Sequence, residues 1–401
     1  MAGTASTNPH IIGLTGSFGS GCTYVAKNLL ANLGYRRISL SDLRRQERAS
    51  KTGHGNGVPR EGLQAFGDEL RQSRGPDYLA KLAHEAIAQQ SQSDASERWV
   101  IDSIRNPAEV HYLRRFSQNF FLFGIYANRE LRWDRVRTGY NGNRRDFDHD
   151  DERDAGRDSP EHGQRVEDCF AEADVVLTNE EQFTAVGNER FHSLQGKIEG
   201  YVGHISAPLS RRQPTQMETL MAAAYTLSQR SSCLKRKVGA VLTDDEGSII
   251  SSGFNEVPRH SRPCADEFRE CARTVRRQNF AKSFNEKFPQ VEERAAILDL
   301  FRREFRLLDT CRALHAEENA IVNLARNGRS VPLDQCTLYT TTYPCRLCAN
   351  KIVNLGISRV VYLEPYPDPV AKVILRDGGV KDEFFEGITF KAYFRVYGEK
   401  K

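Results

Sequence analysis

The sequence predicts an α/β protein made of two domains. Its 401 residues are more than one domain usually needs and suit two. In the first half, short apolar segments alternate with helical patterns, and the first of these segments runs into a glycine-rich loop. In the last quarter, a strand-like segment at 336–342 leads into a proline and a Cys-x-x-Cys pair. Strands that alternate with helices favour parallel sheets covered by helices.

Composition limits the function and the cellular location. Hydrophobic residues make up 39% and charged residues 27%, and the net charge is only +4, so there is no overall electrostatic case for binding duplex DNA. No apolar run approaches the roughly 20 residues of a membrane span. The first ten residues are polar and lack the apolar core of a signal peptide. Nine cysteines without framework spacing fit a reducing compartment. We expect a cytoplasmic protein that binds neither a membrane nor duplex DNA.

The first domain is predicted over residues 10–200 and begins with a phosphate-binding loop. A strand at 11–15 is followed by a glycine-rich segment and a helix to about residue 33, the layout of a P-loop, whose backbone N–H groups cradle phosphate. A glycine turn that merely packs the strand on the helix is the alternative. The segment departs from the P-loop pattern because Cys22 stands where a lysine would hold the β- and γ-phosphates, which speaks against kinase catalysis. The predicted phosphate-binding residues are Gly16, Ser17, Gly19, Ser20, Gly21, Cys22 and Thr23.

The rest of this half continues the pattern of a doubly wound parallel sheet. Further strands are predicted at 35–39, 99–102, 120–126 and 173–177, and Asp102 ends one of them, where a Walker-B-like aspartate would lie. This half resembles the P-loop nucleotide and deoxynucleoside monophosphate kinases. In such kinases the region matching 141–160, dense here in Asp and Arg, is a lid that carries phosphate-binding arginines, whereas the plainer interpretation is a solvated loop.

The second domain is predicted over residues 215–401. Glycines and prolines at 196–214 indicate a linker, and a helix follows from 215 to about 229. Residues 237–243 and 248–255 form a predicted hairpin. A buried strand at 359–363, a helix at about 369–376 and a last strand at 388–396 would complete an α/β/α sandwich.

Three side chains in this domain have the spacing of a zinc site. Cys345 and Cys348 lie three positions apart, so both sulfurs face the same side of one helical turn that begins after Pro344. His315 would open a second helix, which ends near Asn327. One imidazole and two thiolates fill three positions of a tetrahedral Zn²⁺ and leave the fourth for water.

Glu317, two residues after the histidine, is predicted to carry protons and not to bind metal. The combination H-x-E…P-C-x-x-C is typical of zinc-dependent nucleobase deaminases, in which this carboxylate serves the attack of water on the base. A closed structural site would need a fourth ligand, and neither Cys311 nor Cys336 has motif spacing. A second, structural zinc bound by His260, Cys264, Cys271 and Cys311 is not expected, because their spacings are irregular.

Residues 215–400 resemble the cytidine/deoxycytidylate deaminase family, whose zinc motifs they match. The resemblance implies that His315, Cys345 and Cys348 hold zinc and that Asn255 contacts the sugar. The backbone beside Ala316 would orient the base, and Tyr366, after the strand at 359–363, would stack on one of its faces.

The whole arrangement resembles the bacterial anti-phage deoxycytidylate deaminases, which carry a kinase-like domain before the deaminase. This resemblance implies conversion of dCTP and dCMP to the uracil nucleotides and a first domain that senses a regulatory nucleotide. A homo-oligomer is compatible with it. The alternatives are a deaminase of single-stranded nucleic acid, a tRNA adenosine deaminase and a bifunctional nucleotide kinase-deaminase. The missing P-loop lysine argues against the last. The arginines at 262–277 have a single aromatic residue among them, Phe268, and this lack of interleaved aromatics argues against the first.

Overall fold

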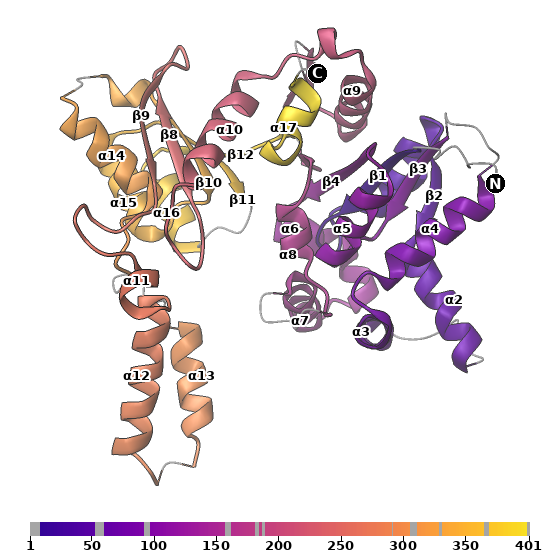
Figure 1. Ribbon diagram of the computed structural model, residues 1–401, viewed down its shortest axis with the longest axis horizontal. Coiled ribbons are helices and arrows are strands. Elements are labelled where there is room, and N and C mark those ends of the chain that lie inside the picture. The colour runs from indigo at the N-terminus through magenta and orange to yellow at the C-terminus, as the bar shows by residue number, and fades with distance from the viewer. Residues whose placement is uncertain are drawn as a thin grey trace. The chain divides into compact units, whose positions relative to one another are not determined.

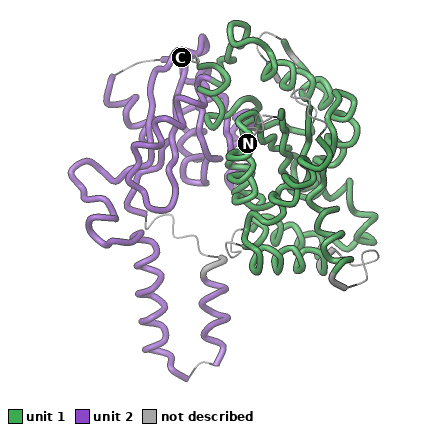
Figure 2. The backbone as a smooth tube through the Cα atoms, turned by 45° about the vertical axis from the view of Figure 1, so that its right-hand side comes forward, with its two compact units in different colours: residues 1–218, 385–401 green, residues 219–384 purple. Residues whose placement is uncertain are grey.

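The computed structural model describes residues 9–398 except for 53–59, 92–96, 157–161, 181–183, 187–188, 291, 305–310, 329–330 and 365–368. The chain forms two compact units (Figure 2). The first unit comprises residues 1–218 and 385–401, and the second comprises 219–384.

A six-stranded sheet in the order β13-β5-β4-β1-β3-β2 forms the centre of the first unit. Five neighbouring strands pair in parallel, which confirms the predicted parallel sheet, and β13 joins antiparallel at one edge. The first six of the seven residues of β4 are buried, as expected for a strand covered on both faces. The strands are β1 (His10–Thr15), β2 (Arg36–Ser39), β3 (Arg98–Asp102), β4 (Phe120–Tyr126), β5 (Val175–Thr178) and β13 (Gly387–Ile388).

Helices connect these strands and cover the sheet (Figure 1). Local sequence explains where several begin: Asn106 caps α5 by accepting a hydrogen bond from the Ala108 N–H, and Pro107 occupies the first helical position. A small hairpin, β6 (Thr184–Val186) with β7 (Glu189–Phe191), precedes α9. The helical segments are α1 (Cys22–Tyr24), η1 (Val25–Leu30), α2 (Leu40–Thr52), α3 (Arg60–Arg74), α4 (Tyr78–Gln90), α5 (Pro107–Phe116), α6 (Arg129–Val136), η2 (Arg137–Tyr140), α7 (Arg144–Ala155), α8 (Val166–Ala171), α9 (Leu194–Ser206) and η3 (Leu209–Arg211).

The linker predicted at 196–214 is wrong over most of its length, because α9 fills it. This helix buries Ile198, Tyr201 and Ile205 in the core of the first unit. Two of the glycines that suggested a linker serve close packing instead: a Cβ on Gly200 would lie 2.6 Å from the ring of Phe191.

Within 141–160, the described residues 141–156 are not a plain solvated loop. Their central part is α7, which buries Phe147 and Asp154. Asp151 of this helix forms an ion pair with Arg132 of α6, and the Tyr140 hydroxyl donates to Asp150 at 2.7 Å. These contacts tie α7 to the segments before it, and phosphate binding by the arginines of this region stays a prediction.

The last strand predicted at 388–396 is also wrong. Only Gly387 and Ile388 form a strand, and it pairs with β5 of the first unit and not with the sheet of the second. Thr389 then caps α17 (Phe390–Tyr397) by accepting a hydrogen bond from the Lys391 N–H. The end of the chain thus completes the first unit.

The second unit is built on a five-stranded sheet in the order β12-β11-β10-β8-β9. The predicted hairpin is confirmed as antiparallel β8 (Gly239–Thr243) and β9 (Ile249–Phe254). β10 (Thr337–Thr342) pairs antiparallel with β8 and parallel with β11 (Arg359–Glu364), and β12 (Lys381–Phe384) follows in parallel. The helices of this unit are α10 (Gln216–Ser228, which begins three residues before the unit), α11 (Cys264–Phe268), α12 (Ala272–Lys287), α13 (Arg294–Glu304), α14 (Ala316–Arg326), η4 (Leu333–Gln335), α15 (Arg346–Leu355) and α16 (Pro369–Asp377).

A helical hairpin, α12 with α13, projects from the second unit between β9 and α14 (Figure 1). Its two helices meet through Phe280 and Phe301, whose rings stack with centroids 4.5 Å apart. No residue of α12 is fully buried. Among the described residues, no helix is both long enough and apolar enough to cross a membrane.

Candidate metal centre and catalytic site

The strand-to-helix connection from β10 to α15 positions the two predicted cysteine ligands. Cys345 is the N-cap of α15, and its carbonyl accepts the Ala349 N–H at 2.8 Å, the first hydrogen bond of the helix. Cys348, one turn further on, is buried. The prediction that both thiols lie on one helical turn is confirmed.

Helix α14 positions His315 and Glu317 because three polar side chains tie the helix to the edge strand β9. The Asn319 amide donates to the Phe254 carbonyl at 2.8 Å, the Asn323 amide donates to the Ser252 carbonyl at 2.9 Å, and the Ser251 hydroxyl donates to the Ala320 carbonyl at 2.7 Å. A Cβ on Gly253 would lie 2.3 Å from the Ala316 carbonyl oxygen, so only glycine permits this close approach of strand and helix.

His315 precedes this helix in extended backbone, and a short two-stranded contact fixes it. The Leu314 N–H donates to the Glu256 carbonyl at 2.9 Å, and the Glu256 N–H donates back to the Leu314 carbonyl at 3.1 Å. On the other side, Glu318 accepts the His315 N–H at 3.4 Å and the Lys351 ammonium of α15 at 2.5 Å. The Glu318 and Lys351 side chains therefore link α14 to α15.

The imidazole and the two thiols converge. His315 Nδ1 lies 3.3 Å from Cys345 Sγ and 3.4 Å from Cys348 Sγ. Nitrogen and sulfur ligands at tetrahedral zinc, with bonds of about 2.0 and 2.3 Å, lie about 3.5 Å apart. Within the described part of the chain these three residues are the group of His, Cys, Asp and Glu side chains that could hold a metal ion. Their number and chemistry fit Zn²⁺ with one coordination position left open.

The electrostatics of the cluster favour a thiolate. A hydrogen bond from Cys348, together with one from His315, lowers the pKa of Cys345 to about 4. The same hydrogen bond raises the pKa of Cys348, because the proton that Cys348 donates to Cys345 is harder to remove. The hydrogen bond to Cys345 raises the pKa of His315. A divalent cation at this point would displace the remaining protons and bind both sulfurs as thiolates.

Glu317 lies beside the cluster and not within it. Its side chain is 3% exposed, and Oε2 is 3.7 Å from Cys348 Sγ. Burial raises the pKa of this carboxyl, so it exchanges protons more readily near neutral pH than an exposed glutamate. Thr340 of β10, fully buried, lies 3.5 Å from Glu317 Oε1. Sequence reasoning missed this contact, and its only signal was a threonine four residues before Pro344.

The structure describes two of the three residues that are predicted to contact the substrate. Asn255 follows β9, and its amide accepts the Val238 N–H at 2.7 Å and donates to the Arg236 carbonyl at 2.8 Å, so here it holds the loop before β8. Its contact with a sugar stays a prediction. Ala316 is buried at the first position of α14, beside the cluster. Tyr366 lies outside the described residues.

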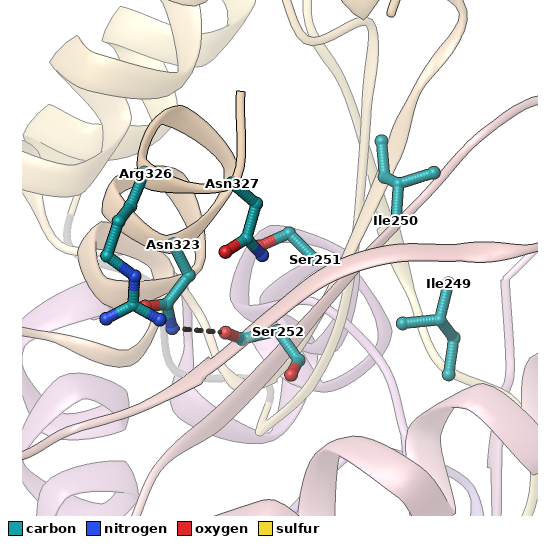
Figure 3. A pocket seen from close by; sticks show the side chains of 7 residues that line it. All are labelled: Ile249, Ile250, Ser251, Ser252, Asn323, Arg326 and Asn327. Atoms are coloured by element: carbon teal, nitrogen blue, oxygen red, sulfur yellow. Dashed lines mark hydrogen bonds between the residues drawn. The ribbon is translucent and has the colours of Figure 1, made fainter. Parts of the chain in front are cut away.

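A cavity of about 340 Å³ in the same unit lies away from the cluster (Figure 3). Its walls come from β9 and from the last turns of α14, including Asn323 and Arg326, whereas His315 precedes the opposite end of that helix. This cavity is therefore not the place where the metal ligands and Glu317 meet.

The predicted phosphate-binding loop of the first unit runs from Gly16 to the start of α1. Gly19 and Gly21 have φ angles of 84° and 107°, a conformation that favours glycine. The Thr23 hydroxyl donates to Asp102 at 3.2 Å, so the start of α1 is tied to the end of β3. Burial raises the pKa of Cys22 to about 12, so its thiol supplies no charge. Phosphate binding by Gly16, Ser17, Gly19, Ser20, Gly21, Cys22 and Thr23 stays a prediction.

Comparison with known proteins finds relatives of the second unit. The family model of the cytidine and deoxycytidylate deaminase zinc-binding region matches residues 214–364. The deoxycytidylate deaminase of Enterobacteria phage T4 is 34% identical over 169 residues, which cover 41% of this chain and 86% of the phage enzyme. That of Saccharomyces cerevisiae is 34% identical over 175 residues, which cover 43% of this chain and 45% of the yeast enzyme, so the match spans less than half of that relative.

A solved structure is also similar. The dCMP deaminase of cyanophage S-TIM5, crystallised in complex with dCMP and dUMP, is 25% identical, and the match covers 43% of this chain and 98% of that one with a TM-score of 0.29.

A His–Cys–Cys cluster that could hold a metal ion, with a buried glutamate beside it, is the arrangement typical of zinc-dependent hydrolytic deaminases. The phage T4 relative is matched over most of its length at more than 30% identity. The chain therefore belongs to the cytidine and deoxycytidylate deaminase family.

Proposed function

We propose that the chain catalyses the hydrolytic deamination of deoxycytidine nucleotides, converting dCMP to dUMP and dCTP to dUTP with release of ammonia. The observation that carries the proposal is the buried carboxylate of Glu317, 3.7 Å from Cys348 Sγ in the metal cluster. The relatives that match this region from phage T4 and yeast are deoxycytidylate deaminases, which supports a deoxycytidine nucleotide as the substrate.

His315, Cys345 and Cys348 would hold the zinc ion. When bound, zinc lowers the pKa of a water molecule to about 7 and so supplies a nucleophile at neutral pH. Glu317 takes one proton from the water as its oxygen adds to C4, and delivers this proton to N3 of the cytosine. The carboxylate then takes the second proton from the hydroxyl now on C4 and gives it to the 4-amino group. The C4–N bond breaks, ammonia leaves and C4 becomes the carbonyl carbon of the uracil. The raised pKa of its buried carboxyl suits a group that must both accept and donate.

Thr340 fits a supporting role in this mechanism. Its hydroxyl lies 3.5 Å from Glu317 Oε1 and 3.1 Å from the Thr342 carbonyl, and it can donate to either oxygen. When it donates to Glu317, it helps to fix the orientation of the carboxylate. We therefore treat Thr340 as a positioning residue.

Glu317→Gln tests the assignment. The amide keeps the size of the side chain but cannot carry the proton, so kcat/KM for dCMP should fall by about 10²- to 10⁴-fold. Zinc content per chain, measured by mass spectrometry of the metal, should stay unchanged. Ammonia release at the wild-type rate with zinc still bound would refute the proposed mechanism.

Glu246→Gln is the matched control. Glu246 is exposed in the turn of the β8–β9 hairpin, so the same chemical change there should leave dCMP turnover within about twofold. Assaying dCMP and dCTP side by side with a cytosine-containing single-stranded oligonucleotide then distinguishes a nucleotide deaminase from an enzyme that edits nucleic acid.

We also propose that the first unit binds a regulatory nucleotide and gates the deaminase, in a pathway that depletes dCTP during phage infection. The parallel sheet, the glycine loop and the Thr23–Asp102 hydrogen bond support a nucleotide-binding unit. The uncharged thiol of Cys22 argues against phosphoryl transfer by this unit. Measuring deamination with dTTP, ATP or dCTP added as effectors tests the gating, and rates that none of them changes would contradict it.

A further inference from the structure

The residue two positions before the proposed zinc ligand Cys345 is bonded to a strand that does not adjoin its own. Tyr343 follows the last residue of β10 and is 6% exposed. Its hydroxyl donates to Asp382 Oδ2 of β12 at 2.9 Å. In the sheet, β11 lies between β10 and β12. The Tyr343 side chain therefore extends across β11 to reach its partner.

The ring of Tyr343 packs on β11 on the way to this bond. It meets the ring of Tyr362 in a T-shaped arrangement, with centroids 4.7 Å apart and an interplanar angle of 78°. The ring of Tyr362 in turn contacts that of Phe384, with centroids 5.9 Å apart, and both of these residues are buried. Packing thus fixes the ring of Tyr343, and the hydrogen bond to Asp382 fixes its hydroxyl end.

The backbone between Tyr343 and Cys345 has little freedom to absorb a displacement. The ring of Pro344 fixes its own φ, and the residue before a proline is confined to extended conformations. Cys345 is extended too, with φ −74° and ψ 168°, and its carbonyl accepts the first hydrogen bond of α15. A shift of Tyr343 is therefore passed on to Cys345 almost undiminished.

The end of β10 has one further side-chain anchor, but it lies before Tyr343. Thr341 Oγ1 accepts the Gly239 N–H at 3.2 Å, which holds the strand against β8. The Thr342 hydroxyl, by contrast, is buried without a hydrogen-bond partner. Among the residues that the structure describes, Tyr343 is thus the next side chain after Thr341 that is hydrogen-bonded on the way to Cys345.

We propose that Tyr343 is a positioning residue for zinc and holds Cys345 in place through its hydrogen bond to Asp382. The inference rests on the proposed zinc site and adds to it two residues that are not part of the H-x-E and P-C-x-x-C motifs. Ligands must be held within about 0.5 Å of the productive geometry. A displaced Cys345 Sγ therefore weakens the hold on zinc and moves the metal relative to Glu317.

Tyr343→Phe tests this inference, because it removes the hydroxyl and keeps the ring that packs on Tyr362. The rate at which the zinc-loaded protein releases its metal to excess EDTA should rise about tenfold, as is typical when a group that supports a metal ligand is lost. With zinc in excess, kcat for dCMP should fall and KM should stay unchanged. A zinc release rate equal to that of the parent overturns the proposal, and so does a change confined to KM.

Asp382 provides a rescue test. Asp382→Asn keeps an oxygen that accepts the Tyr343 hydroxyl, so this variant should release zinc at close to the parent rate, whereas Asp382→Ala should match Tyr343→Phe. Combining Tyr343→Phe with Asp382→Ala should add nothing to the larger single effect, because both substitutions remove the same bond. Effects that multiply would mean that the two side chains act independently, which contradicts the proposal.

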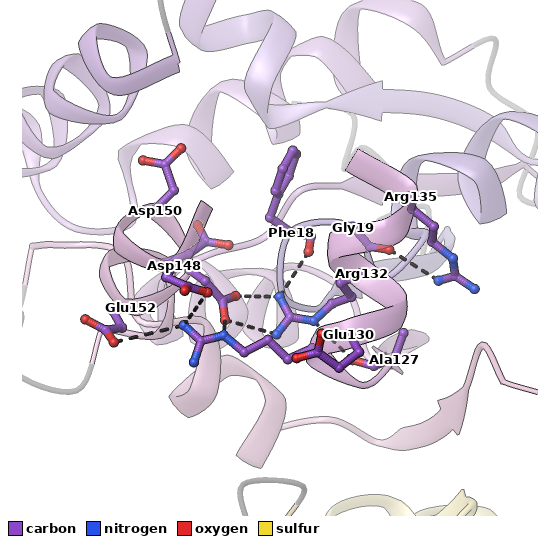
Figure 4. Close-up of polar contacts among 12 residues, drawn as sticks. Phe18, Gly19, Ala127, Glu130, Arg132, Arg135, Asp148, Asp150 and Glu152 are labelled. Atoms are coloured by element: carbon purple, nitrogen blue, oxygen red, sulfur yellow. Dashed lines mark hydrogen bonds and ion pairs between the residues drawn. The ribbon is translucent and has the colours of Figure 1, made fainter. Parts of the chain in front are cut away.

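Two controls separate this role from a general loosening of the fold. Ser358→Ala removes a hydroxyl that donates to the Cys336 carbonyl at 3.2 Å, beside the opposite end of β10. Tyr140→Phe is the same chemical change as Tyr343→Phe, and the partner it loses, Asp150 of α7, lies in the first unit (Figure 4). Both variants should release zinc at the parent rate even where their melting temperatures fall. Faster release from Ser358→Ala would show that any weakening of the sheet frees the metal, and would overturn the proposal.

Zinc release is measured without substrate, so the result does not depend on which nucleotide the enzyme deaminates. Absence of dCMP turnover by the zinc-loaded parent would refute the proposed function and leave the release measurement intact. Unchanged release from Tyr343→Phe would refute this inference and leave the proposed function intact.

Discussion

Two cysteines at the start of helices, one in each unit, have opposite chemistry. Cys345 caps α15 and has its pKa lowered to about 4, whereas Cys22 begins α1 and has its pKa raised to about 12. Both follow a strand and a short loop, and a helix N-terminus favours a thiolate in either position. The difference comes from the neighbours: Cys345 accepts hydrogen bonds from Cys348 and His315, while Cys22 is enclosed beside Ser20 and near the negative charge of Asp102.

The comparison shows that the position of a cysteine on a helix does not decide its role. A second thiol and an imidazole, with the three ligand atoms all within 4.8 Å of one another, make Cys345 a candidate metal ligand. Without such partners, Cys22 remains a small uncharged side chain, at the position where the P-loop pattern has a lysine. Substitutions at both cysteines and at two other residues test this difference.

The largest effect is expected from Cys345→Ser. The hydroxyl does not ionise near neutral pH, so bound zinc should fall from about one ion per chain to nearly none, and dCMP deamination should be lost. Cys22→Ser is the matched control and should retain both. Metal analysis of the two purified proteins decides the matter, and full zinc occupancy in Cys345→Ser would end the contrast between the two cysteines.

The next largest effect is expected at a buried ion pair that holds the end of the chain in the first unit. Lys197 of α9 and Glu386, just before β13, form a fully buried ion pair at 2.9 Å. Lys197→Met leaves the buried carboxylate of Glu386 without the ammonium that balances its charge, so the free energy of unfolding of this unit should fall by about 3–5 kcal/mol.

Tryptophan fluorescence during urea unfolding measures that change in the first unit alone, because both tryptophans of the sequence, Trp99 and Trp133, lie in it. Lys381→Met removes an exposed lysine from β12 of the second unit and should leave the same transition unchanged. An equal shift in the two variants would mean that the buried pair does not hold the end of the chain in place.

Replacing Cys22 by the lysine of the P-loop pattern should have an intermediate effect, on the affinity for ATP. In Cys22→Lys an ammonium replaces an uncharged thiol, and a charge-assisted hydrogen bond of about 1.5–3 kcal/mol corresponds to roughly a tenfold to hundredfold gain in affinity for ATP. Equilibrium binding of ATP to the parent and the variant measures it. Unchanged affinity would show that the thiol is not what limits triphosphate binding by this loop.

The smallest effect is expected at the ion pair between α14 and α15, the helices that begin beside His315 and Cys345. The Lys351 ammonium lies 2.5 Å from Glu318 but is partly exposed, so Lys351→Met should cost no more than about 1 kcal/mol in the free energy of unfolding. Zinc content and dCMP turnover should not change. Loss of zinc in this variant would show that the ion pair, and not the core, sets the spacing of the ligands.

Sequence patterns predicted each half of the metal cluster because the spacing within each half is local. Cys345 and Cys348 share one helical turn, and Glu317 follows His315 at the start of α14, whereas the meeting of the two halves joins residues 30 positions apart. The neighbouring strand and the β8–β9 hairpin follow from alternation and turn residues. By contrast, the contact of Thr340 with Glu317 joins residues 23 positions apart, and no local pattern indicates it.

The end of the chain shows where such patterns fail. Apolar residues alternate at 388, 390, 392, 394 and 396, the period of a strand, which would place Phe394 inside. The structure has it 76% exposed, while Ala392 and Val396, one helical turn apart, are buried in the first unit. Both periods were present in the sequence. Only the surface available beside β5 decided between them.

The sequence by itself therefore determined the groups whose members lie within a turn or a loop of one another: Cys345 with Cys348, His315 with Glu317, and the glycine-rich loop. The tertiary structure decided which unit the last residues complete and that Tyr343 reaches Asp382 across β11. The physical reason is distance along the chain. Backbone geometry fixes spacings of a few residues, whereas contacts between distant segments depend on how whole surfaces pack.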